Sequence, residues 1–339
     1  KIVILDFGSQ YTQLIARRIR ECQVYCEIWP YHLQQCDLNS SDIKGIILSG
    51  SPYSVADPLA PSLEEKILNS NKPLLGICYG LHLLVKTLGG KVVQSQTREY
   101  GKALLTIMEK RGIFEGFGNE MVCWMSHGDS VKEIPPQFQC IAQTETCDYA
   151  AIVDDERKIW GIQFHPEVSH TPLRKEILSN FIFNICGCSP DWTSESIVKQ
   201  QIQWLRNTTQ KEKVVCALSG GVDSVTAAVL TYRAIGDQLS CIFVNNGLMR
   251  KGEPEHVLRN MEALLGRGRV IAVDARERFL KELQGIIDPE QKRKIIGRVF
   301  IEVFEEEARN LGDATCLLQG TTYPDVIESI SVCGPSVKI

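Results

Sequence analysis

One cysteine stands between two glycines in the stretch GICYG at residues 76–80. The apolar run PLLGI leads into it and LHLL follows it, which predicts a strand, a sharp corner and a helix. Gly76 and Gly80 lack the β-carbons that would clash at such a corner. Most free cysteines are small core hydrophobes. The paired glycines instead single out Cys78 as a nucleophile at a helix N-terminus, where amide donors and the helix dipole favour a thiolate.

A thiolate nucleophile needs a base, and the base needs a group that orients it. The stretch QFHPE at residues 163–167 supplies both, as His165 and Glu167. Pro166 disfavours a helical conformation for the residue before it, so His165 stays extended. Residues two apart in an extended chain share a side, so we expect Glu167 to lie beside His165. A lone histidine is more often structural, but His-Pro-Glu at a strand end favours a catalytic role.

The same chemistry needs donors for a developing oxyanion. The loop SGSP at residues 49–52 offers amides near Gly50, and the amide of Tyr79 follows the nucleophile directly. Gly50 and Tyr79 are therefore the predicted oxyanion donors.

A second candidate site is the stretch ALSGGVDS at residues 217–224, between an apolar strand and a helix. Ser219, Gly220 and Gly221 let backbone amides turn inward around an anion at a helix N-terminus. The sequence has no GxxxxGK[ST] motif, which argues against phosphate transfer of the Walker type. Asp223 supplies a carboxylate, the ligand type that Mg²⁺ prefers. A plain glycine turn with a helix cap is the alternative, which the full SGGxDS pattern disfavours.

The elements that would position these residues alternate between strands and helices, which predicts an α/β protein of two doubly wound domains with mostly parallel sheets. Ligand chemistry in such sheets lies at the carboxyl ends of the strands. Strands are expected at 1–7, 44–52, 72–78, 158–168, 239–247, 269–275 and 314–321, and at the start of 213–236. Helices are expected at 11–22, 80–90, 173–187, 194–208, 253–266 and 288–312, and at the end of 213–236. The predicted domains are 1–187 and 211–339, joined by a linker helix within 188–210.

Composition narrows the classes of protein. The 339 residues carry a net charge of −4, which argues against a surface that coats nucleic acid. Asp6 interrupts the first apolar run, and no later run approaches the ~20 residues of a membrane helix. The sequence has 13 cysteines, an odd number, and no CxxC pair. We therefore expect most of the cysteines to be reduced, buried thiols in a cytoplasmic protein.

GICYG together with FHPE resembles the class I glutamine amidotransferase family. The resemblance implies that Cys78 attacks the side-chain amide of glutamine and forms a thioester while ammonia leaves. It also implies that His165 shuttles the proton and Glu167 holds the imidazole. The stretch SHGDS at 126–130 resembles the loop that grips glutamine in this family, which implicates Ser126, His127, Gly128 and Asp129. His82 stands where the family has a glutamine that contacts the substrate, and Ser51 stands where it has a glycine.

SGGVDS resembles the pyrophosphate loop of the ATP pyrophosphatases, which implies a Rossmann-like adenine nucleotide α-hydrolase fold. FVNNGLMR at 243–250 resembles the next strand of that family, with Asn245 where Asp is usual. The stretches DPEQKRKIIG at 288–297 and GTTYPDVIES at 320–329 resemble ligases that adenylate xanthosine 5′-monophosphate (XMP) and aminate it to GMP. The ATP contacts implied are Ser219, Gly220, Gly221, Val222, Asp223, Ser224, Val225, Val244 and Gly320. Asp223 would hold Mg²⁺, and Asp325 and Glu328 would serve XMP adenylation.

The resemblance implies glutamine, ATP and XMP as substrates, no nucleic acid or membrane partner, and a homodimer formed through a further C-terminal domain. Two alternatives stay open. One is another ammonia-using ligase, such as a glutamine-dependent NAD synthetase, although its glutaminase usually has a different fold. The other is a binding protein that senses glutamine and ATP without turnover. Completeness of both motif sets argues against the second alternative.

Overall fold

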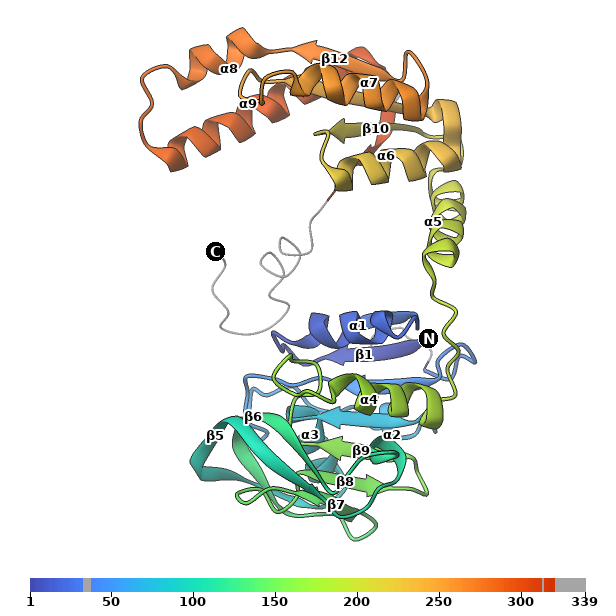
Figure 1. Cartoon of the computed structure of the whole chain (residues 1–339), viewed down its shortest axis with the longest axis vertical. Helices are drawn as coiled ribbons and strands as arrows, with labels where there is room; N and C mark the ends of the chain where they lie inside the picture. The colour runs from blue at the N-terminus through green and yellow to red at the C-terminus, as the bar shows by residue number, and fades with distance from the viewer. Residues whose placement is uncertain (33–37, 313, 321–339) are drawn as a thin grey trace. The chain divides into compact units, whose positions relative to one another are not determined.

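The computed structural model describes residues 1–32, 38–312 and 314–320 (Figure 1). The chain divides into two compact units, of which the first contains Lys1–Thr193 and the second begins at Ser194. Each unit is described by itself below. The predicted domains 1–187 and 211–339 with a linker helix between them stay a prediction.

The first unit is built on one mixed sheet with the strand order β2-β1-β3-β4-β9-β8-β7-β5-β6. Its first five strands pair in parallel: β2 (Cys26–Pro30), β1 (Ile2–Asp6), β3 (Gly45–Leu48), β4 (Leu74–Ile77) and β9 (Ile159–Ile162). The others extend the sheet with antiparallel pairing: β8 (Ala151–Asp154), β7 (Gln139–Gln143), β5 (Lys91–Ile107) and β6 (Glu120–Glu133).

Helices cover both faces of the parallel part of the sheet. Successive side chains of each strand point to opposite faces, and both faces are apolar. Ile2 and Ile4 of β1 pack on the face covered by α1 (Thr12–Glu21) and α4 (Arg174–Ser179), which continues as a π-helical turn at Asn180–Ile185. Val3 and Leu5 pack on the opposite face, against α2 (Glu65–Leu68) and α3 (Tyr79–Thr87). A short 3₁₀ turn, Gly112–Phe114, also packs on the first face.

The second unit is a parallel sheet with the order β12-β11-β10-β13. Its strands are β10 (Lys213–Leu218), β11 (Leu239–Asn245), β12 (Val270–Asp274) and β13 (Ala314–Leu318). Helices α6 (Val222–Ile235) and α7 (Glu253–Leu265) cover one face, and α8 (Arg276–Leu283) and α9 (Pro289–Asn310) cover the other. A 3₁₀ turn, Gly236–Gln238, follows α6.

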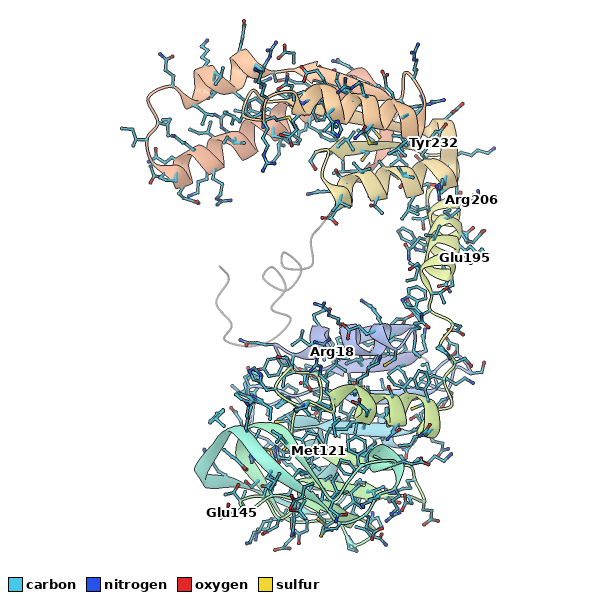
Figure 2. The ribbon with its side chains drawn as sticks, in the orientation of Figure 1. Arg18, Met121, Glu145, Glu195, Arg206 and Tyr232 are labelled. Carbon is cyan, nitrogen blue, oxygen red and sulfur yellow. The ribbon has the colours of Figure 1, made fainter. Side chains whose placement is uncertain are left out.

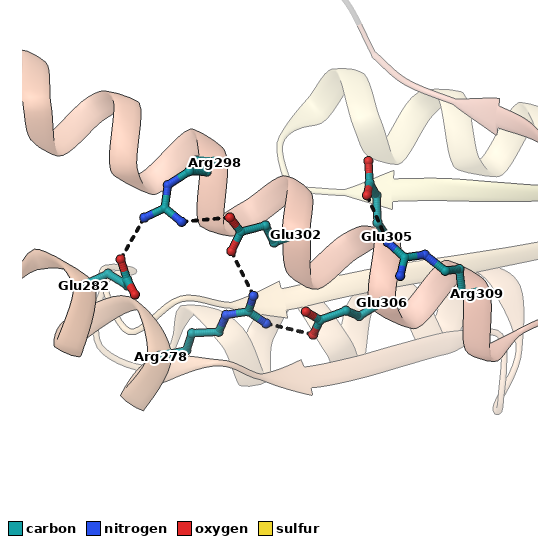
Figure 3. A network of polar contacts seen from close by, with 7 residues as sticks. All are labelled: Arg278, Glu282, Arg298, Glu302, Glu305, Glu306 and Arg309. Atoms are coloured by element: carbon teal, nitrogen blue, oxygen red, sulfur yellow. Dashed lines mark hydrogen bonds and ion pairs between the residues drawn. The ribbon is translucent and has the colours of Figure 1, made fainter.

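Two sets of polar contacts align helices in the second unit. Helix α5 (Ser194–Thr209) is tied to the end of α6, since Arg206, labelled in Figure 2, donates to the carbonyl of Ala234 at 2.9 Å. Figure 3 shows the second set, in which Arg278 of α8 bridges Glu302 and Glu306 of α9. Such exposed ion pairs orient the two helices more than they stabilise the fold.

The predicted α/β class, with helices on both faces, is confirmed. Three local expectations were wrong. The strand expected at 158–168 ends at Ile162, so His165 follows the strand instead of belonging to it. The SHGDS stretch lies within β6 and not in a loop, because pairing with β5 overrides the weak strand propensity of Gly128 and Asp129. The strand at 26–30 and the four strands β5 to β8, which lie between residues 91 and 154, were not predicted.

Among the described residues, no helix is both long enough and apolar enough to cross a membrane.

Candidate active site

Cys78 lies directly after β4, at the carboxyl edge of the parallel strands, and caps the N-terminus of α3. Its backbone has φ 52° and ψ −101°, a conformation that L-residues rarely adopt. The Cys78 amide donates to the carbonyl of Ile162 at 2.8 Å, which ties the corner to the end of β9. Strain of this kind is typical of a nucleophile held out over a sheet.

The glycines beside Cys78 make this corner possible. A β-carbon on Gly76 would lie 2.6 Å from the carbonyl carbon of Gly80, and one on Gly80 would lie 2.5 Å from the carbonyl oxygen of Leu48. Both clashes are with backbone atoms, which cannot move aside as a flexible side chain can. The absence of side chains at Gly76 and Gly80 therefore allows helix α3 to lie close to strand β4 and to strand β3.

His165 and Glu167 reach the same edge because β9 pairs in parallel with β4, with Ile162 opposite Ile77. His165 Nδ1 lies 2.7 Å from Glu167 Oε1, and the Cys78 sulfur is near enough to raise the pKa of the imidazole. With Nδ1 committed to the carboxylate, Nε2 is the nitrogen that faces the sulfur. The structure thus brings together the cysteine, histidine and glutamate that the sequence singled out.

The electrostatics of this trio favour a proton on the histidine. Burial lowers the pKa of His165, but the Glu167 carboxylate and the Cys78 sulfur outweigh it and hold that pKa well above its usual range. A neighbouring anion on each side stabilises the charged imidazolium. The arrangement fits a Cys–His pair in which the sulfur bears negative charge and the imidazolium can protonate a leaving group.

A cavity of about 340 Å³ opens next to the sulfur. Every residue predicted to bind glutamine lines it: His82, Ser126, His127, Gly128 and Asp129. The remaining lining residues are Cys78, Tyr79, Ser51, Pro52, Tyr53, Ser54, Gln94 and Tyr100. Its walls are rich in polar groups, and its size suits a small amino acid.

The far wall of the cavity is held rigidly by hydrogen bonds. His127 Nδ1 lies 2.9 Å from the carbonyl oxygen of Asp129, and its Nε2 lies 3.0 Å from Glu99 Oε2 on β5. Asp129 in turn accepts the amide of Val55 at 3.3 Å. Sequence reasoning missed Glu99, because only the β5–β6 pairing brings it to His127.

The predicted oxyanion donors flank the catalytic trio. The amide of Tyr79 belongs to the first turn of α3, directly after the nucleophile. A β-carbon on Gly50 would lie 3.6 Å from His165 Cε1, so this backbone passes beside the base. Burial raises the pKa of the Tyr79 phenol, whose hydroxyl donates to the carbonyl of Pro61 at 2.6 Å. The Tyr79 side chain is thus anchored by this hydrogen bond, and the oxyanion role predicted for Tyr79 concerns its amide alone.

Sequence reasoning also missed Gln163, which is fully buried. Its Oε1 lies 2.8 Å from His82 Nε2, and its Nε2 lies 3.7 Å from the sulfur of Cys78. Gln163 precedes the His-Pro-Glu motif in the sequence, but no spacing rule places it against α3.

The second candidate site lies at the carboxyl end of β10. Gly220 has φ +84°, and a β-carbon there would lie 2.5 Å from Val257 Cγ2. Ser219 Oγ accepts a hydrogen bond from the amide of Gly221 at 3.3 Å and lies 3.0 Å from Ser224 Oγ. These contacts hold the turn in place at the start of α6. The first turn of α6 carries Val222, Asp223, Ser224 and Val225. The loop is thus a glycine turn that aims a helix N-terminus outward, as an anion site requires.

Other residues predicted for this site are placed unevenly. Gly320 lies against the start of α6, since its β-carbon would be 3.5 Å from the Ser224 amide nitrogen. Val244 is buried near the end of β11. Asp223 is exposed, and the described part of the chain holds no group of three or more side chains suited to bind a metal. Asp325 and Glu328 lie outside the described residues.

A cysteine, a histidine and a glutamate gathered at the carboxyl edge of the parallel strands are the groups that a thiol-dependent acyl-transfer site needs. The chain belongs to the class I glutamine amidotransferase family, whose model, "Glutamine amidotransferase class-I", matches residues 3–185. A second family model, described as "Thiamine biosynthesis protein (ThiI)", matches residues 209–328.

The chain is similar to curated enzymes named "GMP synthase [glutamine-hydrolyzing]". The one from Caldicellulosiruptor saccharolyticus is 53% identical over 97% of this chain and 64% of its own length. The one from Carboxydothermus hydrogenoformans is 51% identical over 100% of this chain and 66% of its own length. The chain thus spans less than two thirds of the length of these relatives. Among solved structures, a glutamine amidotransferase from Thermotoga maritima is 19% identical with a TM-score of 0.42, covering 59% of this chain and 90% of that one.

Proposed function

We propose that the chain carries two linked activities of a glutamine-hydrolysing GMP synthase: release of ammonia from glutamine, and ATP-dependent activation of XMP to receive it. The observation that carries the proposal is the contact of His165 with both Cys78 and Glu167 beside a polar cavity, on a chain whose second unit holds the SGGVDS turn. The similarity to GMP synthases over nearly the whole chain supports the pairing of the two.

The glutaminase reaction follows from the positions of the trio. The sulfur anion of Cys78 attacks the side-chain carbonyl carbon of glutamine, and the amides of Tyr79 and Gly50 stabilise the resulting oxyanion. The carbon–nitrogen bond then breaks as His165 gives its proton to the leaving nitrogen, which departs as ammonia. Water, deprotonated by the now neutral His165, hydrolyses the thioester to glutamate and restores the thiolate and the imidazolium. Glu167 orients the imidazole in both halves of the cycle.

The second half of the reaction belongs to the 211–339 region. We infer that the turn at 219–221 and the α6 N-terminus bind the phosphates of ATP. In the adenylation step, O2 of XMP attacks the α-phosphorus and pyrophosphate leaves. Ammonia then displaces AMP from the purine C2 and gives GMP. Production of ammonia by the same polypeptide favours its capture before water protonates it.

Asp223 fits a role in holding Mg²⁺ that arrives with ATP, because this ion is commonly bound by one or two carboxylates plus substrate phosphates. The exposed position of Asp223 on the first turn of α6 leaves its carboxylate accessible to such a complex. Mg²⁺ would neutralise charge on the phosphates. Asp325 and Glu328 as XMP-facing residues, a homodimer and a cytoplasmic location stay predictions from the sequence.

The chain spans 64% of the length of one relative and 66% of the other. The test therefore measures each of the two activities by itself. Glutamate release from glutamine measures the first half. AMP and GMP formation from MgATP, XMP and an ammonium salt measures the second. We expect Cys78→Ala to abolish glutamate release while ammonium-dependent GMP formation continues, and Asp223→Asn to do the reverse.

Three results would overturn parts of this assignment. Loss of both activities in Cys78→Ala would refute the division of labour. AMP formation with another acceptor but not with XMP would point to a different ammonia-using ligase. Binding of glutamine and ATP without any turnover would point to a sensor.

A further inference from the structure

Gln163 connects His82 to the nucleophile inside the first unit. Its side-chain oxygen lies 2.8 Å from His82 Nε2, and its side-chain nitrogen lies 3.7 Å from the sulfur of Cys78. Gln163 is fully buried, and His82 is 3% exposed. A buried amide with both ends committed has one stable orientation, which its partners decide.

The charge state of His82 decides this orientation. Burial lowers the pKa of His82 to about 4, against smaller opposing contributions from Gln163 and Asp129, while His127 lowers it further. The ring is therefore neutral near pH 7 and carries a single N–H. When that proton is on Nε2, it donates to the oxygen of Gln163 and leaves the amide NH₂ to face the sulfur.

The Cys78 sulfur has other polar neighbours, and they do not duplicate this contact. His165 faces it as the general base, and the carbonyl of Ser126 lies 3.6 Å away and can only accept a hydrogen bond. When the thiol is ionised, the Ser126 carbonyl therefore gives it no stabilisation. Gln163 supplies a neutral donor that stays in place when His165 has given up its proton.

We propose that Gln163 donates an N–H to the sulfur anion of Cys78 and that His82 is the positioning residue that holds the Gln163 amide in this orientation. The inference rests on the proposed glutaminase reaction and assigns His82 a task other than binding glutamine. It also accounts for the histidine at this position. The ring reaches Gln163 from α3 while presenting no charge to the cavity.

The contact has a consequence for reactivity that can be measured without turnover. A donor to the sulfur anion favours ionisation, so its removal shifts ionisation of the thiol to higher pH. Hydrogen bonds to a charged group are stronger than those between neutral groups, so a shift of about one pH unit is expected. The Michaelis constant for glutamine should change little, because Gln163 touches the sulfur and not the cavity surface.

The experiment measures the rate at which iodoacetamide alkylates Cys78 between pH 5 and 10, with the modified residue identified by mass spectrometry. Gln163→Met fills the same space without a donor, and we expect it to move the midpoint of alkylation up by about one pH unit. It should also lower kcat for glutamate release at least several-fold. His82→Leu should cause a smaller shift in the same direction. His82→Gln, which restores a donor toward Gln163, should shift the midpoint less than His82→Leu does.

Controls keep the outcome interpretable. Gln143→Met, on the exposed side of β7, should leave the midpoint in place. If Gln163→Met does not fold, Gln163→Asn replaces it, because the shorter side chain withdraws the amide from the sulfur and keeps a polar group. An unchanged midpoint in the folded variant overturns the proposal, and so does equal impairment by His82→Leu and His82→Gln. A downward shift means that the amide oxygen faces the sulfur, which also overturns it. Absence of glutamate release by the unmodified chain would instead refute the proposed function, since alkylation does not need turnover.

Discussion

Glu167 Oε1 lies 2.7 Å from His165 Nδ1, and both side chains are almost completely buried. This contact selects the tautomer of the imidazole and turns Nε2 toward the sulfur. The backbone supports the pair, because Arg18 donates to the carbonyl of Glu167 at 3.1 Å and Thr171 donates to that of His165 at 2.8 Å. The backbone on both sides of this contact is thus held by Arg18 of α1 and by Thr171, which precedes α4.

The first prediction concerns this pair. Glu167→Gln keeps the shape of the side chain but removes the charge that holds the imidazolium. We expect kcat for glutamate release to fall by about 10² to 10⁴, with little change in KM, because orientation of the base is lost while the cavity is intact. Glu156→Gln, in an exposed turn, is the matched control. An unchanged kcat for the Glu167 variant would mean that His165 needs no orienting group.

The second prediction concerns the corner that carries Cys78. Gly80→Ala places a β-carbon 2.5 Å from the carbonyl oxygen of Leu48, so α3 must move away from β3. We expect a loss of about 1–3 kcal/mol in the free energy of unfolding, as for an overpacked core site. Urea denaturation followed by tryptophan fluorescence measures it. Gly118→Ala, where the nearest atom would be 4.0 Å away, should have almost no effect. Equal midpoints for the two variants would show that the corner has room for a side chain.

How much of this site could be foreseen depends on the range of the interaction. Residues 76–80 and 163–167 reveal Cys78, His165 and Glu167, because the corner and the His–Glu contact are local in the chain. Strands β3, β4 and β9 are short and fully apolar, so their pattern is clear. The contact of Gln163 with His82 was not foreseeable, since it exists only because β9 lies beside β4.

The antiparallel extension was missed for a related reason. Strands β5 and β6 mix charged residues with glycine, and their stability comes from cross-strand pairing that no local propensity reveals. Because those strands were not predicted, the contact between Glu99 and His127, which fixes one wall of the cavity, was not predicted either. In the second unit, by contrast, α7 and α9 begin and end within three residues of the predicted positions, and α6 ends within one residue of its predicted end, because turn or capping residues mark these ends.

The third prediction concerns the turn after β10. Gly220→Ala would place a β-carbon 2.5 Å from Val257 Cγ2 at a φ of +84°, so both the turn and α7 must shift. Since the amides of this turn are the proposed phosphate donors, we expect ATP affinity to fall at least ten-fold, while glutamate release at Cys78 continues. Gly297→Ala, in α9 with open space around it, is the control. Nucleotide binding measured by isothermal titration calorimetry decides the matter, and equal affinities would contradict the assignment.

The fourth prediction is a pH dependence of stability caused by His82. Burial lowers the pKa of His82 to about 4 in the folded protein, against the ordinary value of 6.5. Between those values the unfolded chain binds a proton at this residue and the folded chain does not, so stability is lost as pH falls from 6.5 toward 4. The shift corresponds to roughly 3 kcal/mol.

His82→Gln cannot titrate, so its free energy of unfolding should fall less over this range than that of the parent. The contributions of the carboxylates are the same in both chains and cancel in this comparison. Urea denaturation at half-unit pH steps measures the difference, with the exposed His256→Gln as a control that keeps the parent slope. Parallel pH profiles for the His82 variant and the parent would show that this ring takes up its proton equally in both states. The neutral donor assigned to it beside Gln163 would then lose its physical basis.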